Sequence, residues 1–199
     1  MHSVGISVTA FFAASAALLI GIGLALQTLF QDTISGIFIL VDQSVHVGDI
    51  IEIDGKVGRI IEIKLRTTRA VTIENKVLVI PNHLYLTHSL YNWTQNGILT
   101  RESISVGVAY GSDIDLVKEL LMQATQNIKG VLKEPKPMVL FNDFAESALE
   151  FKIIFSVNNS FLACVPKSDV RSKIYELFKA KGIEIPFPQR EVFIKETKS

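Results

Sequence analysis

Residues 4–26 read VGISVTAFFAASAALLIGIGLAL, and this apolar run decides how the rest of the chain is arranged. No Asp, Glu, Lys or Arg occurs from Ser3 to Gln31, and the first charged residue is Asp32. As a helix, the run is long enough to cross a hydrocarbon core of about 30 Å. The sequence therefore predicts a membrane-spanning helix followed by water-soluble domains.

Two other interpretations of the apolar run are disfavoured. A secretory signal peptide would need a basic region before the apolar stretch, a shorter apolar core and a small-residue cleavage site after it. A buried helix in a soluble core would rarely continue for so many residues without a charge. A membrane-spanning helix, in contrast, requires neither a cleavage site nor an unusually long buried helix.

Small residues are frequent in the predicted helix, where they would let neighbouring helices approach closely. Ile20 and Leu24 lie one turn apart and form a ridge with Ala16. Small residues flank this ridge, with Ala17, Gly21 and Ala25 on one side and Gly23 on the other. The pattern suits a ring of identical helices whose bulky ridge closes a pore by excluding water. The spacing of these residues alone is equally compatible with an ordinary helix in which Ile20 and Leu24 pack against lipid or against another membrane-spanning helix.

An amphipathic helical pattern follows Gln27. One face of this predicted helix is apolar and carries Phe30, Ile34, Ile37, Phe38 and Val41. The polar residues lie on the other faces, namely Gln31, Asp32, Thr33 and Ser35. We expect this segment to lie along or beneath the membrane interface. Gly36 weakens the helix and permits close approach of another element, so a bend is expected between Gln27 and Gly36.

Residues 42–98 are expected to form a small, Sm-like antiparallel β barrel. Short segments rich in β-branched residues are joined by turns at Asp54-Gly55 and Glu74-Asn75: HVGDIIEI at 46–53, KVGRIIEIKL at 56–65 and KVLVIPN at 76–82. Nucleic-acid modules share this pattern. Basic and acidic residues are balanced here, however, so we prefer a solvated surface of mixed charge.

Residues 99–185 predict a ferredoxin-like α+β domain of order βαββαβ. The expected elements are a strand around Ile104, a helix capped by Ser112, strands at MVLFNDF (138–144) and LEFKIIFSV (149–157), a helix over 167–181 ending at Gly182, and a strand at 183–185. Residues 186–199 are expected to add a C-terminal strand at 192–194 and a tail.

Nothing in the sequence points to catalysis or to a cofactor. The 199 residues include 20 basic and 20 acidic ones, so no global field would recruit nucleic acid. The four histidines show no metal-ligand spacing and Cys164 has no partner in a motif. Gly21 and Gly23 lie in an apolar helix, not in a phosphate-binding loop. We therefore expect no catalytic residue, no metal, no cofactor and no enzymatic activity.

Four segments in series carry a family resemblance: GIGLALQ (21–27), HVGDIIEI (46–53), VLVIPN (77–82) and VGVAYGSDID (106–115). With these motifs, the chain resembles the small-conductance (MscS-type) mechanosensitive channel family over nearly its whole length. The resemblance implies a homoheptamer in the inner membrane, with a pore-lining helix and an interfacial amphipathic helix within residues 1–41 and a cytoplasmic vestibule with side portals. Such a channel would release ions and small osmolytes on osmotic downshock.

The resemblance also assigns roles to positions in the first helix. The two constricting positions of the family's pore fall on Ile20 and Leu24, which are the ridge found from spacing. The small residues along which neighbouring pore helices slide fall on Ala17, Gly21 and Gly23.

Two departures from the family pattern limit these expectations. Thr28 stands where the family usually has a kink glycine, so Gly36, which matches a second family glycine, is the better hinge candidate. Members of the family also have at least two further membrane helices before the pore helix. We therefore expect the chain to be a fragment or to need another polypeptide, and not to respond to tension alone. A membrane-anchored oligomeric scaffold without conduction is the alternative function.

Overall fold

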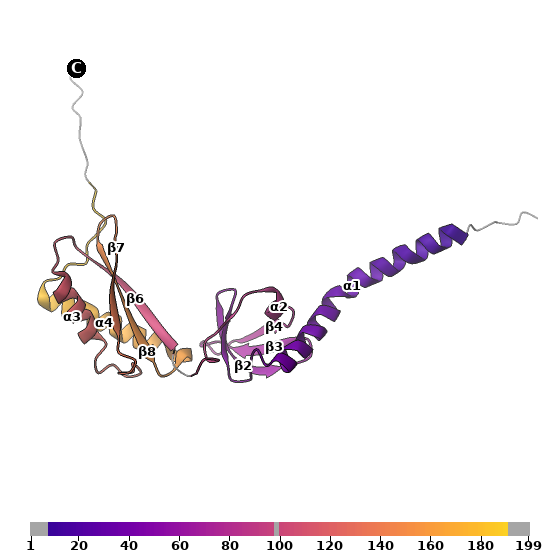
Figure 1. Ribbon diagram of the computed structural model, residues 1–199, viewed down its shortest axis with the longest axis horizontal. Coiled ribbons are helices and arrows are strands. Elements are labelled where there is room, and N and C mark those ends of the chain that lie inside the picture. Colours follow the sequence, from indigo (N-terminus) through magenta and orange to yellow (C-terminus); the bar gives the residue numbers. More distant parts are fainter. Residues whose placement is uncertain (1–7, 98–99, 191–199) are drawn as a thin grey trace, which may run out of the picture. The chain divides into compact units, whose positions relative to one another are not determined.

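The computed structural model describes residues 8–97 and 100–190 (Figure 1). The chain divides into two compact units between Gln95 and Asn96. The first unit contains a long helix and a β domain, and the second contains an α+β domain.

Helix α1 runs without interruption from Val8 to Asp42. It is long and apolar enough to cross a membrane, and its most apolar window is 0% buried. Residues 16–31 are all exposed. An apolar helix that the described part of its own chain leaves uncovered is not the core helix of a soluble domain, because it must be covered by lipid or by other chains.

The β domain is one antiparallel sheet in the order β4-β3-β2-β1-β5. Asp54 and Gly55, both with positive φ, make the tight turn between the first two strands, and Asn75 has a φ of 62° in the turn between β3 and β4. The predicted small antiparallel β domain is confirmed, with the elements β1 (Ile50–Ile53), β2 (Lys56–Ile63), β3 (Thr67–Val71), β4 (Val77–Pro81), α2 (Leu84–Thr87) and β5 (Tyr91–Asn92).

The core of the β domain includes one residue from α1. Ile39 is buried together with strand residues such as Ile51 and Ile60. The end of α1 is thus part of the hydrophobic core of the β domain, so the helix and the sheet cannot separate without exposing apolar surface.

The second unit is a three-stranded antiparallel sheet, in the order β6-β8-β7, covered on one side by α3 and α4 (Figure 1). Alternate residues of the central strand are fully buried: Phe151, Ile153, Phe155 and Val157. The predicted α+β domain is confirmed, with the elements β6 (Thr100–Val108), α3 (Ile114–Ala124), β7 (Met138–Phe144), β8 (Leu149–Val157), η1 (Ser160–Leu162) and α4 (Cys164–Lys181).

Two local predictions in this unit are wrong. Asp113, not Ser112, is the N-cap of α3, because its carboxylate accepts hydrogen bonds from the amides of Asp115 and Leu116. Residues 183–185 form no strand. The Glu184 carbonyl accepts one hydrogen bond, from the Ala109 amide at 2.9 Å, whereas a β-strand needs a series of backbone hydrogen bonds to its neighbour. The strand expected at 192–194 lies outside the described residues.

The end of α4 agrees with the sequence pattern. Gly182 has the left-handed conformation, with a φ of 68°, and its amide bonds to the last turn of the helix. Glycine adopts this conformation without steric cost, which is why the helix ends there.

We expect the substitution Asp113→Ala to lower the free energy of unfolding of the second unit by about 1 kcal/mol, since it removes the helix cap. Asp113→Asn should be nearly neutral because asparagine caps equally well. Denaturant unfolding of the detergent-solubilised chain measures both. A larger loss for Ser112→Ala than for Asp113→Ala would contradict the assigned cap.

Candidate functional site: helix α1 and its docking on the β domain

The predicted constriction residues lie on the uncovered part of α1. The Ile20 and Leu24 side chains are 64% and 66% exposed. Apart from its chain neighbours and the nearby backbone of the helix itself, a Cβ built on Gly21 or Gly23 has no described atom within 4 Å. These positions and Ala17 are therefore free to contact other chains or lipid, and their roles in a pore stay predictions.

The C-terminal part of α1 docks on the β domain through its polar side. Asp32 and Thr33 are half-buried, and Ser35 and Gly36 are buried. The apolar face points away from the β domain, with Phe30, Ile34, Ile37, Phe38 and Val41 all exposed. A helix on a soluble domain normally buries its apolar face and exposes its polar one. Here the arrangement is reversed, which fits a segment whose outer side meets a membrane or neighbouring chains.

Gly36 packs tightly against the β domain. A Cβ at this position would lie 2.1 Å from the Leu65 carbonyl oxygen and 2.7 Å from the Asn82 side-chain nitrogen. Only glycine leaves room for the loop between β2 and β3 at this distance. The close approach expected at Gly36 is confirmed.

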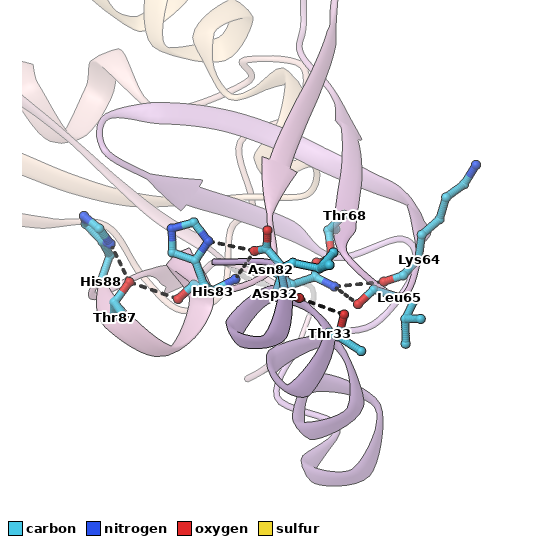
Figure 2. A network of polar contacts seen from close by, with 10 residues as sticks. Asp32, Thr33, Lys64, Leu65, Thr68, Asn82, His83, Thr87 and His88 are labelled. Atoms are coloured by element: carbon cyan, nitrogen blue, oxygen red, sulfur yellow. Dashed lines mark hydrogen bonds and ion pairs between the residues drawn. The ribbon is translucent and has the colours of Figure 1, made fainter. Parts of the chain in front are cut away.

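Asn82 holds that loop in place (Figure 2). Its side-chain nitrogen donates to the carbonyls of Lys64, at 2.8 Å, and Leu65, at 3.1 Å, and its side-chain oxygen accepts from the Thr68 hydroxyl at 2.9 Å. The side chain is fully buried, so each of these bonds offsets the cost of removing a polar group from water. Asn82 therefore shapes the surface against which Gly36 packs.

A polar contact beside Gly36 joins the helix to the β domain. Asp32 Oδ1 accepts a hydrogen bond from the His83 backbone amide at 3.0 Å and lies 2.7 Å from His83 Nδ1 (Figure 2). The two side chains are 13% and 26% exposed, respectively. We call the contacts of Asp32 and Gly36 with Leu65, Asn82 and His83 the docking contact.

Sequence reasoning missed most of the docking contact. The sequence pattern showed Asp32 only as the end of the apolar run and as a polar residue of the amphipathic segment, and it showed His83 only as a histidine without metal-ligand spacing. The one signal was the sequence Pro81-Asn82 after a β-branched strand, because a buried asparagine at the end of a strand needs several hydrogen-bond partners.

Hydrogen bonds and burial set the charge state of two groups elsewhere in the β domain. Burial would raise the pKa of the Asp49 carboxyl, but the bonds it accepts from Asn92, the His46 amide and Thr94 lower that pKa below its ordinary value. Burial raises the pKa of Tyr85 to about 12. Asp49 is thus charged and Tyr85 neutral at physiological pH, and Asp49 ties the start of the sheet to its last strand.

The described residues offer little for chemistry. Across 8–97 and 100–190, no group of three or more His, Cys, Asp or Glu side chains is placed to hold a metal ion. Cys164 is exposed at the start of α4. The arrangement that the structure does build is mechanical, namely an uncovered apolar helix joined firmly to a folded domain.

Two family models match most of the chain. The β-domain of mechanosensitive ion channels matches residues 28–95, and the C-terminal part of the mechanosensitive ion channel MscS matches residues 102–185. The chain belongs to the MscS family of mechanosensitive channels. The first match begins at Thr28 and so includes the docked part of α1 with the β domain.

Relatives of the MscS family share sequence and fold with the chain. An uncharacterised MscS family protein of Haemophilus influenzae is 35% identical over 180 residues, and the mechanosensitive channel MscK of Escherichia coli is 36% identical over 139 residues. These matches cover 90% and 70% of this chain, but the chain spans only 16% and 12% of the two relatives. The Helicobacter pylori MscS, solved in its closed state, superposes with a TM-score of 0.77 at 25% identity, covering 97% of this chain and 76% of the other. The family resemblance and the predicted fold are confirmed.

We expect Gly36→Ala to weaken the docking contact by about 1–3 kcal/mol, because the new methyl group meets a backbone oxygen that cannot move aside easily. Hydrogen exchange of the Asn82 amide, which bonds to the Arg66 carbonyl at 2.9 Å, should become about tenfold faster.

Gly23→Ala is the matched control for this substitution, since it makes the same chemical change in the same helix where space is open. It should leave exchange at Asn82 unchanged. Equal exchange rates in the two variants would show that Gly36 is not a close-packing position.

Proposed function

We propose that the chain forms the pore helix and the cytoplasmic vestibule of a homoheptameric mechanosensitive channel in the inner membrane. Membrane tension opens this channel, which then releases ions and small osmolytes on osmotic downshock. The observation that carries the proposal is the reversed docking of α1. The β domain takes the polar side of the helix and leaves the apolar side, and residues 8–31 before it, for lipid and neighbouring subunits.

In this proposal Ile20 and Leu24 form the constriction. Their side chains lie one turn apart on the uncovered part of α1, so a ring of subunits would place two stacked apolar rings on its axis. Such rings exclude water when the helices are close together and admit it when the helices separate. Ala17, Gly21 and Gly23 provide the close helix-to-helix contacts that the closed ring needs.

The docking contact favours one of the two hinge candidates, Thr28 and Gly36, over the other. Gly36 packs against Leu65 and Asn82, so the helix around it moves with the β domain. The helix before Asp32 has no such support within the described residues. Bending is therefore easier at Thr28 than at Gly36, and we place the hinge on the membrane side of Asp32.

The remaining assignments follow the family. Residues 1–41 form the pore and interfacial segments, residues 42–98 and 99–185 form the vestibule in the cytoplasm, and residues 186–199 form the C-terminal segment. The intact protein crosses the membrane several times. The similarity to a Helicobacter pylori channel solved in its closed state supports assigning the docked α1 to a closed conformation.

We expect Leu24→Ser to lower the tension needed for opening, measured in patch recordings of the native protein. The substitution removes about 2 kcal/mol of apolar stabilisation per subunit from the closed constriction. Water then enters the constriction more easily.

Leu18→Ser is the matched control, since Leu18 lies on the side of the helix opposite the ridge and is also exposed. It should leave the tension threshold nearly unchanged. If Leu24→Ser gated like the unmodified protein, the helix would be an anchor and the chain a membrane-bound scaffold.

A further inference from the structure

We propose that the contact between Asp32 and His83 is a pH-responsive latch, which holds α1 on the β domain more firmly when the His83 imidazole is protonated. The inference concerns how firmly the end of α1 is attached to the β domain. Acidification on the side of the soluble domains would make this attachment firmer.

The geometry gives Asp32 two bonds to one residue of the β domain. The His83 backbone amide, 3.0 Å away, holds the Asp32 carboxylate at any pH. His83 Nδ1, 2.7 Å from the same oxygen, donates a second bond in either the neutral or the protonated ring. Protonation therefore adds a full positive charge to a bond that is already formed, without needing the side chains to move.

Partial burial allows this added charge to matter. The Asp32 and His83 side chains are 13% and 26% exposed, so water and salt screen their attraction less than they screen an ion pair on the open surface. Hydrogen bonds between charged groups are also stronger than those in which one partner is neutral. The latch is consequently present in both protonation states of His83, but it is weaker when the imidazole is neutral and stronger when it is charged.

The other ionisable groups around the latch do not replace His83 as the titrating group. Arg66, in the loop between β2 and β3, also acts on Asp32, but an arginine stays charged at every physiological pH. The Lys64 ammonium in that loop pairs with Glu62 at 3.4 Å. His88, at the end of α2, contacts the Thr87 hydroxyl at 3.1 Å and reaches His83 only through that residue.

The sign of the effect follows from the charges. Histidine is the side chain whose charge ordinarily changes between about pH 5 and pH 8. The carboxylate of Asp32 remains available as an acceptor across that range, so acid strengthens the latch and alkali weakens it. Unlike most effects of acid on folded proteins, which weaken carboxylate contacts, this one tightens a contact.

The test compares hydrogen exchange of the Asn82 amide in the detergent-solubilised chain at about pH 6 and about pH 8, with each rate divided by the intrinsic exchange rate at that pH. We expect the protection of this amide to be about fivefold greater at the acid pH. Asp32→Asn, which keeps an oxygen for the His83 amide, and His83→Gln should each abolish this difference. His88→Gln is the matched control and should retain it.

Equal protection of the Asn82 amide at the two pH values in the unmodified chain would overturn the latch and leave the proposed function standing. A pH difference of unchanged size in Asp32→Asn would overturn it as well, because the carboxylate charge would then have no part in the effect.

Discussion

The rest of the structure depends on the close contact of Gly36 with the Leu65 carbonyl and Asn82. A glycine without a side chain lets the polar side of α1 press onto a loop that a fully buried asparagine holds in shape. Once that side is fixed, the apolar face of the same helix has to point outward, and Ile39 completes the core beneath it. One steric constraint therefore sets both the attachment of the helix and the direction in which its apolar surface faces.

This direction is what connects the fold to a function in membranes. A long apolar helix that the described part of its own chain leaves exposed is unstable in water, since each uncovered side chain forgoes the free energy of burial. Lipid and further copies of the helix can cover it, and the small residues Ala17, Gly21 and Gly23 suit contact between copies. The β domain behind the docking contact then moves with the end of the helix. A rigid attachment at Asp32 and Gly36 and an unsupported span before them are the mechanical elements that a tension-gated pore requires.

The sequence predicted these elements better than it predicted their contacts. Hydrophobic periodicity located the apolar helix and the strands because burial patterns repeat every two or 3.6 residues, and positive-φ residues at Gly55, Asn75 and Gly182 marked turns and a helix end. The wrong cap at Ser112 arose because serine and aspartate are equally good caps and lie side by side. The Asp32–His83 contact joins residues 51 apart in sequence, and no local pattern encodes such a pairing. The strand expected at 183–185 fails for a similar reason, since its ladder depends on partners that a local pattern does not reveal.

The central claim is that several copies of the chain share one pore, and the mass of the detergent-solubilised protein tests it most directly. Native mass spectrometry or light scattering corrected for bound detergent gives the number of chains in the particle. A shared pore of this family predicts a single species with the mass of a heptamer. A monomer would contradict it, because Ile20 and Leu24 would then have no axis around which to form a constriction.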